Sequence, residues 1–219
     1  MKRLWQIMVL IAICSKLYSQ DYTFSVYTSP LSAVDYVSHP MVSLGGEYIF
    51  LDRLGLAAEY GIKYKDNYKY DTLWEKSKGY TYRIELKYYD IHKFRKGSLR
   101  NYISLEYRYI KDNHNEVFTY HQDTSSVDDI KDNYGVLKDI YIGNLKYGII
   151  IGLGKRFYTD VYCGIGIRYR DVRNTHREYN PDIGNEPAYV DDIFSSFGLE
   201  EESGLYPNLS FGFKIGIRF

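Results

Sequence analysis

Apolar and polar residues alternate with a period of two along most of this chain, and that period is typical of a β-strand with two different faces. The final stretch NLSFGFKIGIRF keeps the pattern unbroken from Leu209 to Phe219, with an apolar residue at every odd position. Helical periodicity is nearly absent, so the pattern indicates an all-β fold. Eight strands are predicted: Tyr22–Ser29, Met41–Leu51, Leu54–Asp66, Lys78–Asp90, Leu99–Lys111, Lys138–Lys155, Thr159–Val172 and Leu205–Phe219.

The connections between these segments alternate between short and long. The short ones are residues 52–53, 91–98 and 156–158, and the long ones are residues 30–40, 67–77, 112–137 and 173–204. An up-and-down sheet does this when all short turns lie at one end, together with both termini. We therefore predict an eight-stranded antiparallel up-and-down transmembrane β-barrel. The prolines are expected in the connections, where no ladder N–H is lost: Pro30, Pro40, Pro181, Pro187 and Pro207.

The composition of the polar face predicts which face points inward. It carries glycine repeatedly, at Gly148, Gly152, Gly154, Gly164 and Gly166. A strand surface in water gains nothing from glycine, which weakens strands. The lumen of a narrow barrel, in contrast, needs positions without side chains beside long charged ones. We therefore place the polar face inside and the apolar face toward lipid. The alternative is a water-soluble barrel with the two faces exchanged.

Tyrosine is unusually frequent, with 26 residues in the chain. Many of these tyrosines lie near the ends of the predicted strands, where aromatic girdles meet the two membrane interfaces. The simpler alternative is the ordinary preference of tyrosine for strands. The tyrosines assigned to the girdles are Tyr80, Tyr82, Tyr88, Tyr107, Tyr109, Tyr141, Tyr158, Tyr169 and Tyr206.

The N-terminus has the pattern of a secretory signal. Lys2 and Arg3 precede an apolar run over Ile7–Cys14, and Ser19 is a plausible cleavage position. We expect a signal peptide at residues 1–19 and a single barrel domain at residues 20–219. Removing three basic residues leaves 28 − 3 = 25 basic against 28 acidic residues, so net charge gives no case for nucleic acid.

On these features the chain resembles the eight-stranded outer-membrane β-barrel proteins of the OmpA/OmpX-like class. The terminal Phe219 on an alternating strand looks like the signal by which that family engages the barrel assembly machinery. The segments Ser29-Pro30-Leu31, Gly46-Glu47-Tyr48 and Leu54-Gly55-Leu56 are similar to small barrels of Bacteroidota. The resemblance implies the outer membrane of a Gram-negative cell, with outer-membrane lipid and lipopolysaccharide as surroundings.

The predicted lumen is strongly charged. Its acids are Glu47, Glu59, Glu85 and Glu106, and its bases are Lys63, Arg83, Lys87, Arg108, Lys146, Arg168, Arg170, Lys214 and Arg218. Eight strands enclose a space just wide enough for side chains to fill. We expect these charges to pair into a plug, because unpaired buried charges are costly. A narrow pore that prefers anions is the alternative.

Catalysis is a further alternative. A lipid A deacylase-like enzyme would need a histidine with a serine and an acid near the outer leaflet. His114 and His121 share the predicted loop 112–137 with Ser125, Ser126, Asp123 and Asp128, but no motif fixes their geometry. His92 falls at a short turn, on the wrong side for that substrate, and the remaining histidines are His39 and His176.

The long loops are acidic, which raises the possibility of divalent cation binding. Loop 112–137 contains Asp112, Glu116, Asp123, Asp128, Asp129 and Asp132, and loop 173–204 contains Glu200-Glu201-Glu202. No EF-hand pattern is present, and ordinary solvated loop charge is the simpler explanation. Residues 190–199 have the spacing of a short amphipathic helix. The sequence therefore predicts no catalytic, cofactor or metal residues. It predicts a non-enzymatic outer-membrane barrel with a structural or surface-interaction role, whose extracellular ligand, if any, it does not identify.

Overall fold

The computed structural model describes residues 24–33, 41–50, 53–63, 78–92, 99–121, 130–179, 186–187 and 201–219. These residues are almost entirely strand. The strands are β1 (Phe24–Thr28), β2 (Met41–Phe50), β3 (Leu54–Lys63), β4 (Lys78–Tyr89), β5 (Leu99–His121), β6 (Ile130–Leu153), β7 (Phe157–Thr175), β8 (Glu186–Pro187) and β9 (Glu202–Arg218). One 3-10 turn, η2 (Pro30–Ala33), follows β1. The predicted signal peptide lies outside the described residues. No helix in the described part of the chain is long and apolar enough to cross a membrane.

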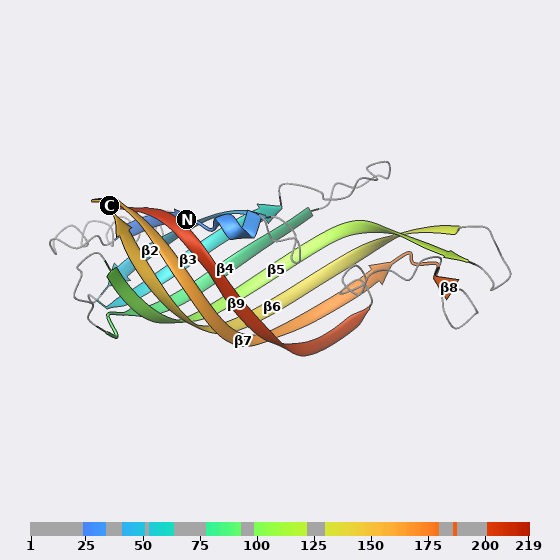
Figure 1. Cartoon of the computed structure of the whole chain (residues 1–219). Coiled ribbons are helices and arrows are strands. Elements are labelled where there is room, and N and C mark those ends of the chain that lie inside the picture. Colours follow the sequence, from blue (N-terminus) through green and yellow to red (C-terminus); the bar gives the residue numbers. More distant parts are fainter. Residues whose placement is uncertain are drawn as a thin grey trace, which may run out of the picture.

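The strands close into a barrel. Their order is β4-β3-β2-β1-β9-β7-β6-β5, and a further β4–β5 pairing joins the two ends of this series. Every pair is antiparallel, and the two-residue β8 pairs only with the far end of β5. The prediction of an eight-stranded antiparallel up-and-down barrel is confirmed (Figure 1). Phe24 and Phe219 meet at the β1–β9 seam, where the Phe219 amide donates to the Phe24 carbonyl at 2.9 Å.

The register fixes the dimensions of this barrel. A row of paired residues that starts at Tyr158 and passes once around the barrel returns to β7 at Arg168, which gives a shear of 168 − 158 = 10. With eight strands, that shear corresponds to a strand tilt of about 40° and a radius of about 8 Å. The residues of the row are Tyr158, Gly216, Tyr27, Gly45, Glu59, Arg83, Arg108, Ile142 and Arg168.

Three strands run well beyond the rest and form what we call the outer arm, made of residues 114–121, 130–137 and 170–179 (Figure 1). The predicted loop 112–137 was therefore wrong, because β5 continues to His121 and β6 begins at Ile130. The alternation in residues 112–137 was not recognised because many of these residues are polar. Asp112 is buried because Lys63 pairs with it at 2.8 Å, and buried Asp132 accepts two backbone N–H groups.

The prediction that prolines occupy only connections also fails. Pro207 lies inside β9, and Pro187 belongs to β8. In the described residues, β9 pairs with β1 only from Ile215 to Arg218, so its other residues have a strand neighbour on one side only. A proline is accommodated on such an edge because no ladder hydrogen bond is needed on that side. Pro40 and Pro181 lie outside the described residues.

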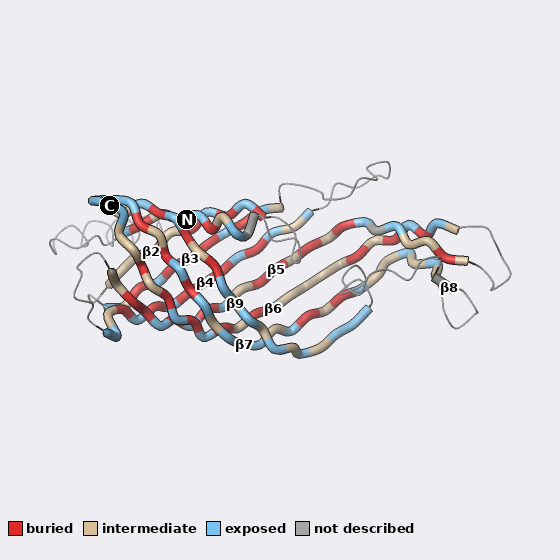
Figure 2. Tube along the Cα trace, viewed as in Figure 1, coloured by how far each residue is buried: buried red, intermediate tan, exposed pale blue. Residues whose placement is uncertain are grey.

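Burial follows the predicted faces. In Figure 2 buried and exposed positions alternate along the strands of the barrel. The outward residues are mainly apolar, as at Leu105, Leu145 and Ile165, whereas the buried inward residues include many charged side chains. Gly154 is an exception to the predicted face, because it lies in the β6–β7 turn with a φ of 79°. The polar face therefore points inward, as the glycine pattern predicted.

Candidate functional site

The half of the barrel interior that is nearer the short turns holds two chains of ion pairs. In the first, the Lys87 ammonium lies 2.8 Å from a Glu47 oxygen and 3.1 Å from an Asp160 oxygen. Tyr89 donates to Glu47, and Tyr102 donates to Asp160 at 2.9 Å. Each carboxylate thus has an ammonium and a phenol as partners, which offsets the cost of burying its charge.

The second chain is centred on Glu85. Its carboxylate accepts from Lys214 at 2.6 Å and from Ser104 at 2.6 Å, and Lys146 lies 3.1 Å away. Lys146 also reaches Glu106 at 2.5 Å, and Arg83 joins Glu106 to Glu59 with contacts of 3.1 and 3.0 Å. Positive and negative groups therefore alternate from Lys214 to Glu59 across the lumen.

Tyrosines fill the space beside these charges, and glycines make room for them. Tyr102 lies across from Gly148, where an added Cβ would come within 2.5 Å of the tyrosine ring. The luminal pairs of this kind are Tyr27–Gly45, Tyr102–Gly148, Tyr158–Gly216 and Tyr162–Gly212. The luminal glycines thus mainly accommodate tyrosine rings rather than long charged side chains. Ammonium groups lie over several of these rings, at 4.3 Å for Lys87 on Tyr102 and 4.1 Å for Lys146 on Tyr162.

Five of the outward-facing tyrosines form one ladder across five strands. Tyr60, Tyr82, Tyr109, Tyr141 and Tyr169 are successive partners in a single row. Neighbouring rings lie 5.2 Å apart for Tyr82 and Tyr109 and 5.0 Å apart for Tyr109 and Tyr141. The sequence predicted girdles at both interfaces, and this row accounts only for tyrosines on the long-loop side of the wall. Two of the girdle tyrosines were assigned wrongly, because Tyr158 is luminal and Tyr206 lies on the same face as the inward Lys214. Both have the parity of the polar face, which their position near a strand end concealed.

Two arginines, Arg108 and Arg168, lie at the outer mouth of the lumen, beyond the ion-pair chains. They belong to the same row as Arg83, with Ile142 between Arg108 and Arg168. Arg83 engages the two nearby glutamates, whereas Arg108 donates to the Thr81 hydroxyl at 3.2 Å. Among the described residues, no carboxylate lies within ion-pair distance of Arg108 or Arg168. The buried Nε of Arg168 has no hydrogen-bond partner there, and its guanidinium carbon lies 5.9 Å from the Tyr206 ring centroid.

Asp160 is a luminal residue that the sequence analysis missed. It shares the parity of Tyr162 on the polar face of β7, and extending the alternation by two residues would have found it. With it, the two ion-pair chains hold five acids against four bases, so the predicted basic excess is not a property of the plug. The acids are Glu47, Glu59, Glu85, Glu106 and Asp160, and the bases are Arg83, Lys87, Lys146 and Lys214. The excess lies at the outer mouth instead.

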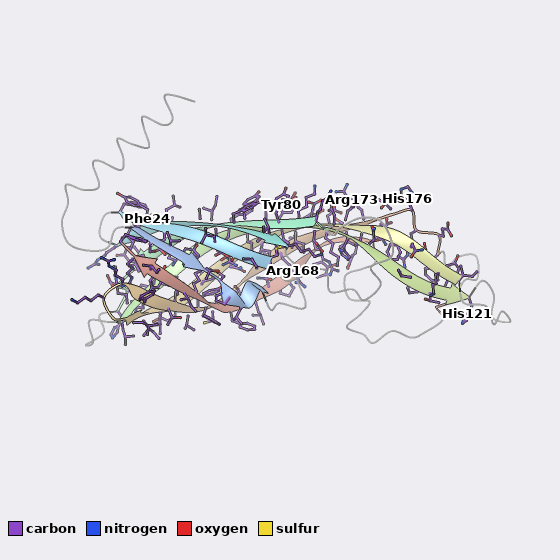
Figure 3. All side chains as sticks on the ribbon, turned by 90° about the horizontal axis from the view of Figure 1, so that it is seen from above. Phe24, Tyr80, His121, Arg168, Arg173 and His176 are labelled. Carbon is purple, nitrogen blue, oxygen red and sulfur yellow. The ribbon has the colours of Figure 1, made fainter. Side chains whose placement is uncertain are left out.

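The histidines of the catalytic alternative are separated. His114 is buried in β5 with its Nδ1 3.0 Å from Asp112, whose other oxygen pairs with Lys63. His121 ends β5 at the far end of the outer arm (Figure 3). His92 lies at the β4–β5 turn, as predicted. Ser125, Ser126, Asp123, Asp128 and His39 lie outside the described residues, so of the predicted kinds of catalytic group the structure places only an acid, Asp112, beside His114.

The acids of the predicted cation-binding loops are partly engaged in the fold. Asp132 accepts from the backbone N–H groups of Glu178 and Tyr179 at 2.8 and 2.9 Å. Glu202 pairs with Arg170, and Glu201 accepts from the Asn174 amide at 2.8 Å. In the ranges that the structure describes, no group of three or more potential ligands could hold a metal ion. Asp123, Asp128, Asp129, Glu200 and the segment 190–199 lie outside those ranges.

Comparison with solved structures finds the crystal structure of the N-terminal β-barrel domain of Pseudomonas aeruginosa OprF. The match covers 90% of this chain and 95% of that chain, with 12% sequence identity and a TM-score of 0.39. No family profile matches the chain. No curated protein matches it either.

Proposed function

We propose that this chain is a non-enzymatic outer-membrane β-barrel with a closed lumen and a structural or surface-interaction role. The observation that carries the proposal is the inversion of polarity across the barrel wall. Side chains such as Ile165, 65% exposed, cover the outside, while lysines and glutamates are buried inside as ion pairs. A water-soluble barrel would have the opposite arrangement. Closed antiparallel barrels with an outward apolar band are the form in which strands cross a membrane.

The surface-interaction part of the proposal rests on the outer arm. The arm has a small core of its own, in which Tyr134, Val136 and Val172 are buried against one another. The Arg177 guanidinium lies 5.2 Å from the Tyr134 ring centroid and 5.3 Å from that of Tyr179. These contacts favour a defined conformation of the arm, which suits presentation of a recognition surface beyond the lipid.

Membrane fractionation followed by gel mobility with and without boiling tests this proposal. We expect recovery in the outer membrane and a band that migrates differently before heating, because a closed barrel resists unfolding by detergent. Cleavage of residues 1–19 is part of the same expectation and is checked by the mass of the recovered protein. Recovery of a folded chain in the soluble periplasm would contradict the proposal and favour the soluble alternative.

The two alternative functions have separate tests. A pore would have to pass the Lys87, Glu85 and Lys146 pairs, whose side chains are buried and mutually bonded. Single-channel recording that found defined conductance steps would favour the pore. A lipid-modifying enzyme would depend on His114 or His121, so lipid A mass spectrometry with both replaced by alanine would show a lost modification.

The terminal residue is proposed to engage the barrel assembly machinery. Phe219 is exposed and lies beside Phe24, with ring centroids 6.3 Å apart, at the seam that closes the barrel. Deleting Phe219 is expected to lower outer-membrane recovery several-fold, while refolding of the purified chain in detergent stays nearly unchanged. Truncating Phe24 to alanine removes the ring contact but keeps the terminus, and serves as the control. Equal recovery of the deletion variant and the native chain would contradict the role of Phe219.

A further inference from the structure

The strand pairing of the barrel wall is interrupted between β2 and β9, and we call this interruption the notch. β1 pairs with β2 only up to Tyr27 and with β9 only up to Thr28, whereas both neighbours continue farther toward the long loops. The chain leaves the wall as η2, which contacts both neighbours. Among the described residues, no strand pairs with the free side of β9 from Glu202 to Lys214. Irregular backbone and an open edge at membrane depth require compensation, because lipid tails satisfy no N–H or C=O group.

The outward residues of β9 beside the notch include no tyrosine, whereas the strands from β3 to β7 carry the tyrosine ladder. The tyrosine ladder stops at Tyr169, whose partner on β9 is Leu205. Leu205, Leu209 and Phe211 are 70%, 81% and 79% exposed, which makes them more exposed than the large apolar residues elsewhere on the described wall. Leu44 on β2 and Leu31 on η2 are also exposed and belong to the elements on the other side. Leu205, Leu209 and Phe211 therefore leave more of their apolar surface open to acyl chains than the described outward residues of the other strands do.

Behind this edge lies the positive mouth of the lumen. Arg168 is paired with Tyr206 of β9, so it is one strand away from the free edge, and its side chain is on the inward face. It lies ten residues above Tyr158 on β7, which is about 25 Å along the barrel axis at the tilt given by the shear. An outward apolar band is also about 25 Å tall. Tyr158 is the second residue of β7, at the short-turn end, so an apolar band that begins there ends at the level of Arg168, which we take as the depth of the outer headgroups.

We propose that the notch binds one phosphate-bearing lipid of the outer leaflet. Its phosphate pairs with Arg168, assisted by Arg108, and its acyl chains lie along Leu209 and Phe211. Charge complementarity supports this occupant, because an anionic headgroup supplies the partner that the described residues do not give these two guanidinium groups. The inference rests on the proposed membrane location and adds a specific lipid site to it.

Competitive lipid binding tests the proposal on the full mature chain refolded in detergent micelles. Phosphatidylglycerol and diacylglycerol, which has no phosphate, are added in equal amounts with identical acyl chains, and retained lipid is counted by native mass spectrometry. We expect one phosphatidylglycerol to be retained with a preference of about tenfold, since one charge-assisted contact corresponds to about that factor. Arg168→Gln is expected to bring the preference close to one. Equal retention of both lipids by the native chain would overturn the proposal.

Matched variants locate the site. Arg173→Gln removes the same charge from the same strand. The Arg173 side chain, however, is 59% exposed and pairs with Asp139 and Asp171 on the opposite face of the strand, so the preference for phosphatidylglycerol should persist. Figure 3 labels Arg168 and Arg173. Leu209→Ser is expected to reduce retention severalfold, whereas Leu105→Ser, at an outward position of β5 three strands away from β9, should not. Equal losses in both members of either pair would contradict a site at the notch.

Two further readouts complete the test. Millimolar inorganic phosphate should leave the bound phosphatidylglycerol in place, because the acyl chains contribute to its binding. Full displacement would assign the site to free phosphate and overturn the lipid proposal. Each sample is also run unheated on a gel. A heat-modifiable band without lipid preference would refute the lipid site alone, whereas absence of that band would refute the barrel proposal on which the site rests.

Discussion

Replacing Glu85 by glutamine is expected to destabilise the barrel by about 3–5 kcal/mol, the typical cost of breaking a buried ion pair from one side. The Glu85 side chain is fully buried and accepts from both Lys214 and Lys146. Lys146 keeps Glu106 as a partner, but Glu85 is the only carboxylate within ion-pair distance of Lys214 among the described residues. Its ammonium would therefore remain buried without a counter-charge. Urea unfolding in micelles, followed by the loss of the heat-modifiable band, measures the effect.

Two variants separate this cost from a general effect of charge. Glu202→Gln removes an exposed partner of Arg170 and is expected to cost at most about 1 kcal/mol, as for surface pairs. The double variant Glu85→Gln/Lys214→Met removes the orphaned ammonium together with its partner, so it should recover most of the loss. If Glu85→Gln is as stable as Glu202→Gln, the ion-pair chain does not hold the barrel together as described.

The strand pattern was sufficient to predict the barrel because its two faces meet different surroundings. Alternation, connection length and luminal glycine each report on that difference, and together they gave the strand number and the inward face correctly. Leu145 and Ile165 are outward and Lys146 is inward, as their parity indicates. The local pattern could not give the shear, because that depends on how all eight strands align when the sheet closes.

The parts that the sequence did not reveal depend on long-range partners. Asp112 and Asp132 resemble loop residues until Lys63 and the backbone of Glu178 are seen to satisfy them. Pro207 looks like a turn residue because its free edge exists only where β1 ends early. The orphaned charge of Arg168 is likewise visible only after the other luminal charges have been paired. These features belong to the outer arm, the notch and the outer mouth, where the chain departs from a regular barrel.

Gly166→Ala is expected to lower the stability of the barrel more than any other substitution that adds a single methyl group to the wall. A hydrogen bond between two side-chain amides crosses over this glycine, because Asn208 on β9 donates to Asn144 on β6 at 2.8 Å. Both asparagines are register partners of Gly166 on β7. A Cβ at Gly166 would meet the Gly143 carbonyl oxygen and the Asn144 side-chain oxygen, and would lie 2.8 Å from the Asn144 Cα. Backbone atoms cannot rotate away as a flexible side chain can.

The expected loss is about 3 kcal/mol, at the upper end of ordinary overpacking, because the strand pair itself must separate. Asn144 also donates to Glu106 at 2.8 Å, so its displacement would disturb the second ion-pair chain. Gly143→Ala is the matched control, since Gly143 pairs with the residue next to Gly166 and its added Cβ would meet nothing within 4 Å. The control should change the unfolding free energy by less than about 0.5 kcal/mol. Equal urea midpoints for the two variants would mean that β6 and β7 lie farther apart than the amide bridge implies, because only their close approach distinguishes the two glycines.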